Sequence, residues 1–372
     1  MVYATWTPEE LLSRGFSAPE VTDRRWCVRW DATGQDNGNL VSAMVPPVVD
    51  FHTSGSTGPS RCWRRTREKV WYEAGVLAEL VEPEGPEAVL SFVPPVHLFG
   101  ALTSVLVPAR LRLPVWYRSG FTGPMPDTGR RRLVVMATPW IFSLLLERMA
   151  WVRSLEQISV LYGGAMLPAK AGEFLTEAGP DRALIVEVLG STEAGGIATR
   201  RWRAGEPPAW TLFRDVTFAA AGATAETLLA VRSPRLAFRP GESPPDTWTA
   251  DDWIQPLDDR RFRLLGRRGR LVKVNGRRLN LDEAEHAMRA VLDCEDLALM
   301  PVEDPMIGEH VDLLIVPSGE RGLAGLDLSL AFQRLGVRPR RVHAVTRIER
   351  SELGKLRHSR LSTTNTTEVA TP

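Results

Sequence analysis

The sequence has few cysteines, no long apolar run and almost no net charge, and each absence argues against a class of protein. Its three cysteines, Cys27, Cys62 and Cys294, are odd in number and widely spaced, which fits a reducing compartment rather than a disulfide framework or a zinc site. The apolar stretches are too short or too broken to span a bilayer. The first residues lack the basic flank and apolar core of a signal peptide. We therefore expect a cytoplasmic protein with no membrane segment.

The charges nearly cancel, because the 372 residues carry a formal net charge of +1 although 24% of them are charged. No overall field then selects nucleic acid or an acidic membrane, so phosphate groups must be recognised by a local site. Six arginines between positions 260 and 270 allow an alternative, a basic loop that binds nucleic acid. Acidic neighbours dilute that cluster, and we predict no nucleic-acid partner. These neighbours are Asp251, Asp252, Asp258 and Asp259.

Residues 51–189 alternate between apolar strand patterns and helix patterns, as a parallel α/β layer requires. Strands are expected at residues 88–93, 133–138, 158–164 and 183–190, and helices at residues 64–81, 98–109, 140–150 and 168–177. Loops at the carboxyl ends of parallel strands are where such sheets bind ligands. Up to about residue 45 we expect irregular structure with one short helix near residues 8–14.

The second part of the chain no longer shows the alternation of strand and helix patterns. Short strands with Pro and Gly turns are expected over residues 211–265. A compact α+β module follows, with strands expected around residues 275–276 and at 297–302, 311–317 and 342–348, and helices at 281–291 and 328–335.

These patterns predict an α/β fold class with two domains. A large N-terminal domain over residues 1–265 contains mostly parallel sheets with flanking helices, and a small C-terminal α+β domain covers residues 266–362. Residues 363–372 are small and polar, and we expect a disordered tail there.

The run "HTSGSTGPSR" has the composition of a phosphate-binding loop. Glycines bring backbone N–H groups close to a ligand, and the hydroxyls and the N-terminus of the helix expected next would surround phosphoryl oxygens. The Walker pattern GxxxxGK[ST] is absent. A Ser/Gly linker is the alternative reading of this run alone. The candidate ligand-binding residues are Thr53, Ser54, Gly55, Ser56, Thr57, Gly58 and the cation Arg61.

"TSGSTG" resembles the signature loop [ST]SG[ST]TG-x-P-K of the adenylate-forming superfamily, which includes acyl-CoA synthetases, adenylation domains of nonribosomal peptide synthetases and luciferases. This copy departs at its end, where Pro59 comes one place early and Arg61 replaces the lysine. A guanidinium still holds a phosphate, although with a different geometry. We therefore expect altered handling of pyrophosphate rather than its loss.

Two further segments resemble elements of the same superfamily. "LYGGAMLP" resembles a turn whose small residues let substrate and adenine approach the backbone, and it contributes Gly163, Gly164 and Ala165.

"VLGSTEAGG" resembles the superfamily's "YGxTE" element, with Leu189 in place of the aromatic residue. The resemblance implies that Gly190 and Ser191 line the nucleotide site, that Thr192 contacts the α-phosphate and that Glu193 holds Mg²⁺. A carboxylate suits that task because Mg²⁺ takes hard oxygen ligands.

"WTADDW" resembles the "TGD" element, with Ala250 where glycine is usual, and it gives Asp251 a role at the ribose hydroxyls. A surface acid pair, Asp251 with Asp252, is the alternative reading of these two residues alone. "LLGRRGRLVKVNGRRLNLDEAE" resembles the superfamily's hinge segment. It implies that Arg267 also reaches the ribose and that Lys273 belongs to the nucleotide site.

Gly269 stands where the hinge acid is usual, and glycine still permits a large backbone rotation. The module after it would then be a mobile lid. "SELGKLRHSRL" resembles the C-terminal "xxGKxxR" loop, with Glu349 and His358 in place of its usual proline and arginine. Lys355 is therefore the candidate catalytic lysine, since a flexible ammonium can follow charge from a carboxylate to the α-phosphate.

The acid is expected between "VPPVHLFG", "LYGGAM" and "GST". His97 stands where many acyl- and aryl-CoA ligases have a histidine near the carboxylate, and a core or capping histidine is the alternative. No acidic residue lies between Ser91 and Arg110, so an α-amino acid substrate is not expected. The apolar helix from Leu98 favours an aryl, cinnamoyl-like or fatty acid.

The resemblance implies an ATP- and Mg²⁺-dependent ligase that forms an acyl-adenylate and releases pyrophosphate. The acyl group would then pass to the thiol of coenzyme A or of a carrier-protein phosphopantetheine. Departures from the motifs leave open a specialised ligase with another acceptor, such as an amide synthetase or a nitrite-dependent diazotase of secondary metabolism. They also leave open a nucleotide-binding pseudoenzyme.

The segment before the phosphate loop is short, since 52 residues precede Thr53. Relatives usually carry a much longer segment there, so we expect a reduced N-terminal region. The surface that it leaves is a candidate contact for another copy of the chain.

Overall fold

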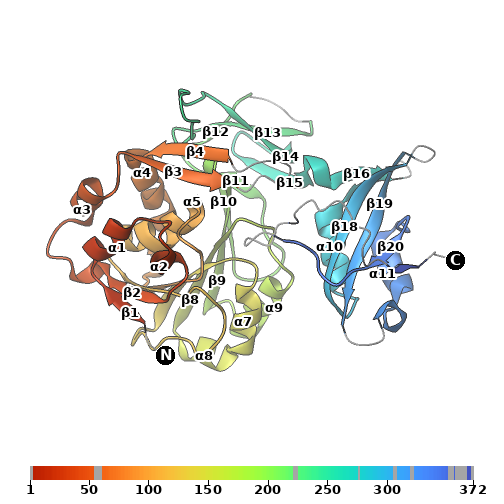
Figure 1. Cartoon of the computed structure of the whole chain (residues 1–372), viewed down its shortest axis with the longest axis horizontal. Coiled ribbons are helices and arrows are strands. Elements are labelled where there is room, and N and C mark those ends of the chain that lie inside the picture. The colour runs from red at the N-terminus through yellow and green to blue at the C-terminus, as the bar shows by residue number, and fades with distance from the viewer. Residues whose placement is uncertain are drawn as a thin grey trace.

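The structure is a computed structural model of the chain, and it describes residues 3–53, 61–220, 225–274, 277–304, 308–318, 322–350, 356 and 367–369. The ribbon forms a large body and a small body (Figure 1), which join where β15 (Arg261–Arg267) leads through a 3₁₀ turn (Arg268–Arg270) into β16 (Leu271–Val274). Each body has a hydrophobic core of its own.

The large body is built on a 13-stranded sheet in the order β1-β2-β6-β5-β7-β8-β9-β10-β11-β15-β14-β13-β12. Five neighbouring strands at its centre are parallel. The expected strands of the α/β layer are confirmed among them, and β6 is an addition that its proline and short length concealed. These strands are β5 (Ala88–Ser91), β6 (Pro114–Tyr117), β7 (Arg132–Ala137), β8 (Gln157–Gly163) and β9 (Ala183–Ser191).

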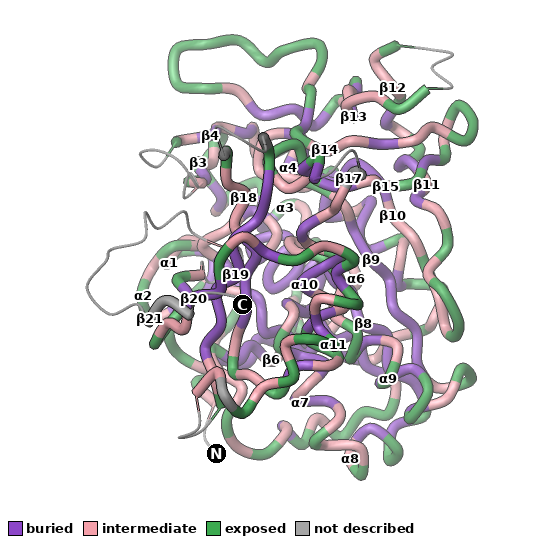
Figure 2. Tube along the Cα trace, turned by 90° about the vertical axis from the view of Figure 1, so that its right-hand side faces the viewer, coloured by how far each residue is buried: buried purple, intermediate pink, exposed green. Residues whose placement is uncertain are grey.

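The central strands read as continuous apolar runs because both faces of the sheet are covered. On β7, Leu133, Val135 and Ala137 point into one core, and Val134 and Met136 point into the other. In Figure 2 the strands β8 and β9 are coloured mostly as buried. Helices α7 (Ile141–Glu147), α8 (Met149–Ser154) and α9 (Lys170–Ala178) cover the first face.

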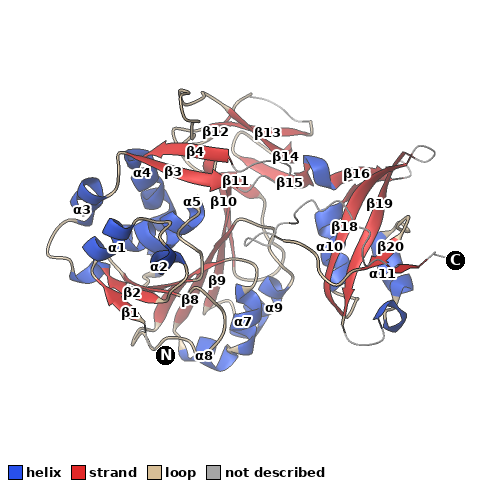
Figure 3. Cartoon of the chain, viewed as in Figure 1, coloured by secondary structure: helices blue, strands red, loops and turns tan. Residues whose placement is uncertain are grey.

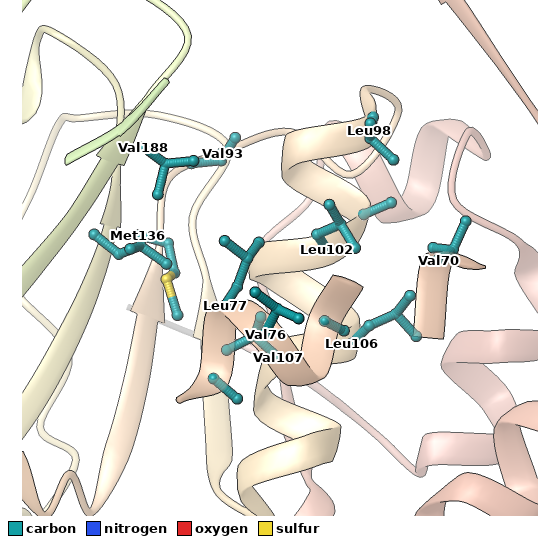
Figure 4. Packing of buried hydrophobic residues seen from close by; sticks show 14 of the residues in the cluster. Val70, Val76, Leu77, Val93, Leu98, Leu102, Leu106, Val107, Met136 and Val188 are labelled. Atoms are coloured by element: carbon teal, nitrogen blue, oxygen red, sulfur yellow. The ribbon is translucent and has the colours of Figure 1, made fainter. Parts of the chain in front are cut away.

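The opposite face carries α4 (Arg67–Ala78) and a long helix that begins as α5 (Leu98–Gly100), passes through a π-helical stretch (Ala101–Leu106) and ends as α6 (Val107–Leu111). Figure 4 shows the apolar side chains of these two helices packed together beside Met136 of β7 and Val188 of β9. The helices expected at 98–109 and 140–150 are therefore confirmed, the second as two shorter pieces.

The sheet continues beyond β9 as antiparallel strands. The short strands expected over residues 211–265 are present, but they extend the same sheet instead of forming a layer of their own. The first of the added strands, which pairs with β9, was not expected. The added strands are β10 (Gly195–Trp202), β11 (Trp210–Leu212), β12 (Thr217–Phe218), β13 (Thr227–Arg232), β14 (Trp248–Pro256) and β15.

The N-terminal region is more regular than predicted. Helix α1 (Pro8–Arg14) is confirmed, and the side chains of Thr7 and Glu10 form its capping box. The expectation of irregular structure elsewhere is wrong, because β2 pairs with β6 and the buried Trp26 ring stacks 5.1 Å from Tyr117. Strands so short show no period in sequence. The additional elements are β1 (Ala4–Trp6), α2 (Pro19–Thr22), β2 (Trp26–Arg29), a 3₁₀ turn (Trp30–Ala32) and α3 (Asn37–Met44).

A hairpin of β3 (Val48–Thr53) and β4 (Arg61–Thr66) flanks the candidate phosphate loop, and Thr53 pairs with Arg61 at the end next to this loop. The helix expected from residue 64 begins only at Arg67, after Thr66 caps it. The expectation that a helix N-terminus directly follows the loop is therefore wrong. Burial alternates along β4, with Trp63 and Arg65 inside, and this period of two is the signature of a strand.

The small body matches the expected α+β module. A hairpin of β16 and β17 (Arg277–Asn280) leads to α10 (Leu281–Arg289), and a four-stranded sheet packs against α10 and α11 (Leu328–Leu335) (Figure 3). Residues 367–369 form a strand paired with β20, where a disordered tail was expected. The sheet consists of β18 (Cys294–Asp304), β19 (Gly308–Pro317), β20 (Val342–Ala344) and β21 (Thr367–Val369).

Within the described part of the chain, no helix is both long and apolar enough to cross a membrane.

Gly100 has no room for a side chain, since a Cβ there would lie 1.8 Å from the carbonyl oxygen of Pro94. We expect Gly100→Ala to lower the free energy of unfolding by about 3 kcal/mol or more, because backbone atoms cannot rotate away from the clash. Gly172 in α9 is the matched control, because a Cβ there meets nothing within 4 Å. Gly172→Ala should raise the free energy of unfolding by about 0.5–1 kcal/mol. Urea denaturation measures both, and equal stabilities would contradict the packing described.

Candidate active site

The segments singled out in the sequence gather at one edge of the sheet, where β5, β7, β8 and β9 reach their carboxyl ends. Ala137 pairs with Tyr162, and Gly163 pairs with Val188, so the ends of three strands lie level. The structure thereby brings together candidate residues from three loops. These are His97, Gly163, Gly164, Ala165, Gly190, Ser191, Thr192 and Glu193.

The turn after β8 is closely covered by Phe99 of α5. A Cβ on Gly163 would lie 3.0 Å from the tip of the Phe99 ring and 3.3 Å from the carbonyl oxygen of Val188. Gly164 has a φ of +90°, which favours glycine. The Tyr162 hydroxyl donates to the carbonyl oxygen of Met166 over 2.9 Å and holds the turn.

His97 precedes α5 at the same edge and is half-buried. Its carbonyl oxygen accepts from the backbone N–H of Ala101 over 2.8 Å, while its side chain makes no capping bond to the helix. The side chain therefore does not cap the helix, and the two other interpretations, a core histidine and a contact with the acid, stay predictions.

The turn between β9 and β10 carries Thr192 and Glu193, and its backbone is fixed on several sides. The N–H of Ala194 donates to the Ser191 hydroxyl over 3.1 Å, and the carbonyl oxygen of Glu193 accepts from the N–H of Ala237 over 2.8 Å. The strands meet so closely that a Cβ on Gly190 would lie 2.4 Å from the carbonyl oxygen of Gly195. The side chains of Thr192 and Glu193 remain half-exposed.

Behind this turn lies a buried ionic cluster that sequence reasoning missed. Arg65 of β4, fully buried, donates to the carbonyl oxygen of Thr192 over 3.1 Å and to the Glu73 carboxylate over 2.8 Å. The other oxygen of Glu73 accepts from the N–H of Gly196 over 2.7 Å. A signal was present in the sequence, because Glu73 interrupts the apolar face of α4 formed by Val70 and Leu77.

Arg235 and Asp215 complete this cluster. The Arg235 guanidinium lies 3.6 Å from Glu73 and 2.9 Å from Asp215, and it packs on the Phe213 ring. Burial lowers the pKa of Arg65, and the Glu73 carboxylate opposes that shift. We call Arg65, Glu73, Arg235 and Asp215 the buried charge cluster.

The end of the hairpin at the phosphate loop lies four residues along β4 from Arg65 of the buried charge cluster. Thr53 is half-buried and Arg61 is exposed, while Ser54, Gly55, Ser56, Thr57 and Gly58 lie outside the described residues. Arg61 lines a shallow surface pocket together with Cys62, Arg239, Pro240 and Glu242. Backbone bonds between Arg64 and Phe238, of 2.7 and 3.0 Å, hold the two walls of this pocket together.

The candidate ribose residues lie on paired strands, Asp251 on β14 and Arg267 on β15. Asp251 is exposed, and the acid that lies 3.5 Å from Arg267 is its neighbour Asp252. Lys273 is exposed on β16, and its backbone N–H donates to Glu309 over 2.6 Å. Lys355 lies outside the described residues, so its predicted role is not addressed by the geometry.

A divalent cation is implied by the superfamily resemblance. Glu193 takes part in none of the ion pairs found among the residues that the structure describes, so its carboxylate is available as a hard oxygen ligand. In the same part of the chain, no three His, Cys, Asp or Glu side chains converge as a metal cluster.

Residues 32–228, more than half of the chain, match the family described as AMP-binding enzyme. The chain belongs to this family. It is 29% identical to a 4-coumarate–CoA ligase of Rhodobacter capsulatus over 259 residues, which cover 67% of this chain and 59% of that protein. This AMP-binding family member therefore spans less than two thirds of the length of that relative.

The fold resembles solved structures of other ligases. O-succinylbenzoate coenzyme A synthetase of Bacillus subtilis, in complex with AMP, has a TM-score of 0.65 at 17% identity, with 86% of this chain and 70% of that chain covered. ATP-bound MatB of Rhodopseudomonas palustris has a TM-score of 0.62 at 18% identity, with 83% and 66% covered. At these identities the likeness concerns the fold.

The three cysteines of this AMP-binding family member provide a test of where nucleotide binds. Burial raises the pKa of Cys27 to about 11 and also raises the pKa of Cys62, but Cys62 is partly exposed beside Arg61. At pH 8 we expect iodoacetamide to alkylate Cys62 much faster than Cys27, because the thiolate is the reactive form. MgATP at about ten times its Kd should slow the reaction of Cys62 about tenfold by mass action.

Peptide mass spectrometry measures each site separately. Cys294 in the small body is the internal control, and its alkylation rate should not change with MgATP. Equal rates at Cys62 with and without a nucleotide shown to be bound would contradict the placement.

Proposed function

We propose that this chain activates a carboxylic acid as its acyl-adenylate, with ATP as the second substrate and pyrophosphate as a product. The observation that carries the proposal is the junction of two elements. Arg65, four residues after the start of the strand that follows the phosphate loop, binds the carbonyl oxygen of Thr192 directly. Membership of the AMP-binding enzyme family supports the same reaction.

In the first half-reaction a carboxylate oxygen of the acid attacks the α-phosphorus of ATP. The bond from that phosphorus to the bridging oxygen breaks, and pyrophosphate leaves with the bond's electron pair. Thr192 would contact the α-phosphate, Arg61 would hold the leaving phosphates, and Lys355 would offset charge that develops between acid and phosphate. Glu193 would hold Mg²⁺, which would neutralise charge at the phosphate oxygens.

We infer a hydrophobic acid, of aryl, cinnamoyl-like or fatty type. The ring of Phe99 covers Gly163 at the carboxyl edge, and the helix behind it is apolar and buried. The relatives and neighbours include a 4-coumarate–CoA ligase, an O-succinylbenzoate coenzyme A synthetase and an anthranilate CoA ligase. The names of these three ligases all contain aromatic acids, which fits an aromatic wall.

In the second half-reaction a thiol sulfur attacks the acyl carbon and AMP leaves. Coenzyme A or a carrier-protein phosphopantetheine is the proposed acceptor. The small body, residues 266–362, would act as a lid that turns between the two steps.

Two anchored arginines on either side of Gly269 support a pivot at this glycine. Arg267 lies beside Asp252 of the large body, whereas Arg270 binds Asp282 and the carbonyl oxygen of Leu299 in the small body. A Cβ on Gly269, which lies between them, would meet no atom within 4 Å, and a glycine permits a wide range of backbone rotation.

The first test of this function is ATP–pyrophosphate exchange with a panel of aryl, cinnamoyl and fatty acids. Wild type should exchange label with at least one acid of the panel. Lys355→Ala should lower the exchange rate by about 10²–10³-fold, the usual loss when one preorganised charge at a transition state is removed. Lys170→Ala on helix α9 is the control and should keep the wild-type rate.

The acceptor is identified by product mass spectrometry with coenzyme A, an amine or nitrite. Exchange followed by an amide or a diazo product would replace the thiol step with the alternative ligase. Binding of ATP with no exchange on any acid would overturn the adenylation proposal in favour of a pseudoenzyme.

A further inference from the structure

We propose that Arg65 and Glu73 are positioning residues that hold the Thr192–Gly196 turn in register with the nucleotide site. The inference rests on the proposed function for its consequence in activity, but its geometry is independent of the acid and of the acceptor. Neither side chain is placed to touch a substrate, since both act through the backbone of the turn.

The two residues bind the turn at both of its ends. Arg65 donates to the Thr192 carbonyl oxygen from Nε over 3.3 Å and from Nη2 over 3.1 Å, so two donors of one planar guanidinium share a single acceptor. Glu73 accepts from the Gly196 N–H over 2.7 Å at the other end. The bond between Arg65 and Glu73, 2.8 Å long, closes the ring.

The turn itself is shaped to receive the Glu73 carboxylate. Gly195 has a φ of +76°, and a Cβ on it would lie 2.7 Å from one Glu73 oxygen and 2.8 Å from the other. A residue with a side chain would therefore expel the carboxylate as well as strain the backbone. The position of the Glu73 carboxylate therefore requires a glycine at residue 195.

A second guanidinium balances the charge. Arg235 lies 3.6 Å from Glu73 and 2.9 Å from Asp215, so two cations and two carboxylates share one buried volume. The segment after Arg235 also reaches the turn, because the Ala237 N–H donates to the carbonyl oxygen of Glu193. The cluster thus ties the phosphate-loop strand, α4 and the segment after β13 to one turn.

Stability alone does not explain such a cluster. Well-packed apolar side chains of similar volume usually stabilise a core as much as a buried ion pair or more, because both charges must be desolvated. Charged side chains differ in that their hydrogen bonds are directional. A guanidinium and a carboxylate can therefore fix a backbone segment in one orientation. Small displacements of catalytic groups lower rates strongly, so a fixed turn has a direct use beside a metal and a phosphate.

The experiment compares Glu73→Gln with Glu187→Gln. Glu187 of β9 is the matched control, because it is, like Glu73 of α4, a buried carboxylate with an arginine partner, here Arg200 at 2.6 Å. The amide that replaces the Glu73 carboxylate keeps an oxygen for the Gly196 N–H but offers Arg65 no negative charge. Both variants should lower the melting temperature, and the Mg²⁺ dependence of ATP binding and of pyrophosphate exchange should separate them.

We expect Glu73→Gln to raise the Mg²⁺ concentration for half-maximal ATP binding, measured by calorimetry, at least tenfold. Glu187→Gln should leave that concentration within twofold of wild type. The Mg²⁺ concentration for half-maximal pyrophosphate exchange should rise in the same way. The kcat of exchange should change by a larger factor than the KM for the acid. Equal Mg²⁺ dependence in the two variants would overturn the inference, since a purely structural role predicts equal effects.

A double variant separates the loss of stability from the loss of positioning. Arg65→Met with Glu73→Leu removes both charges and fills the volume with apolar atoms, so it should melt near the wild-type temperature. Its Mg²⁺ dependence should nevertheless be shifted at least tenfold, whereas wild-type Mg²⁺ dependence in this variant would refute the positioning role.

The outcome is separable from that of the proposed function. If wild type binds MgATP without exchanging pyrophosphate, the adenylation proposal fails, and the binding measurement still decides the role of Glu73. If wild type does not bind MgATP at any Mg²⁺ concentration, both proposals are overturned.

Discussion

The candidate site depends on one hydrogen-bonded junction, in which the buried guanidinium of Arg65 joins the Glu73 carboxylate to the backbone of Thr192. It connects the hairpin of the phosphate loop to the turn at the end of β9. Each of these elements belongs to a different layer of the large body. Backbone bonds of Arg64 with Phe238 and of Ala237 with Glu193 add a second link between the hairpin and the turn.

This junction lies where the strands of the large sheet change from parallel to antiparallel. From β6 to β9 the strands are parallel and buried on both faces, and from β9 onward they are antiparallel. A parallel sheet presents its loops at the carboxyl edge, whereas an antiparallel neighbour allows the chain to return at once by a tight turn. Thr192 and Glu193 occupy that return, so the change of direction itself brings a rigid turn to the ligand-binding edge.

Local patterns predicted the parallel strands β5, β7, β8 and β9, the longer helices of both bodies and the positions of the motif loops. Helix α1 is an example, since Thr7 and Glu10 form a capping box that can be read from four residues. What could not be read locally was pairing over long distances. Strand β2 is regular because it pairs with β6, and β10 because it pairs with β9.

The candidate site was also predictable where it depends on local sequence and not where it depends on distant contacts. Spacing of glycines and hydroxyl-bearing residues located the turns, and the structure shows several of them at one edge. The buried charge cluster was not foreseen, because Arg65 and Glu73 have charged side chains that composition rules assign to the surface. The hairpin strand β4 was mistaken for the start of a helix for a related reason, since its run of arginines hides the alternation of buried and exposed positions.

The close contact across the β9–β10 turn has a consequence for how such sequences can diverge. Gly190 faces Gly195 with no space between them, and the four intervening residues are bonded at both ends. An inserted or deleted residue here would shift every later side chain of β10 to the opposite face of the sheet. Length variation among homologues should therefore be absent from this turn and concentrated in surface segments such as residues 239–247, which are exposed throughout.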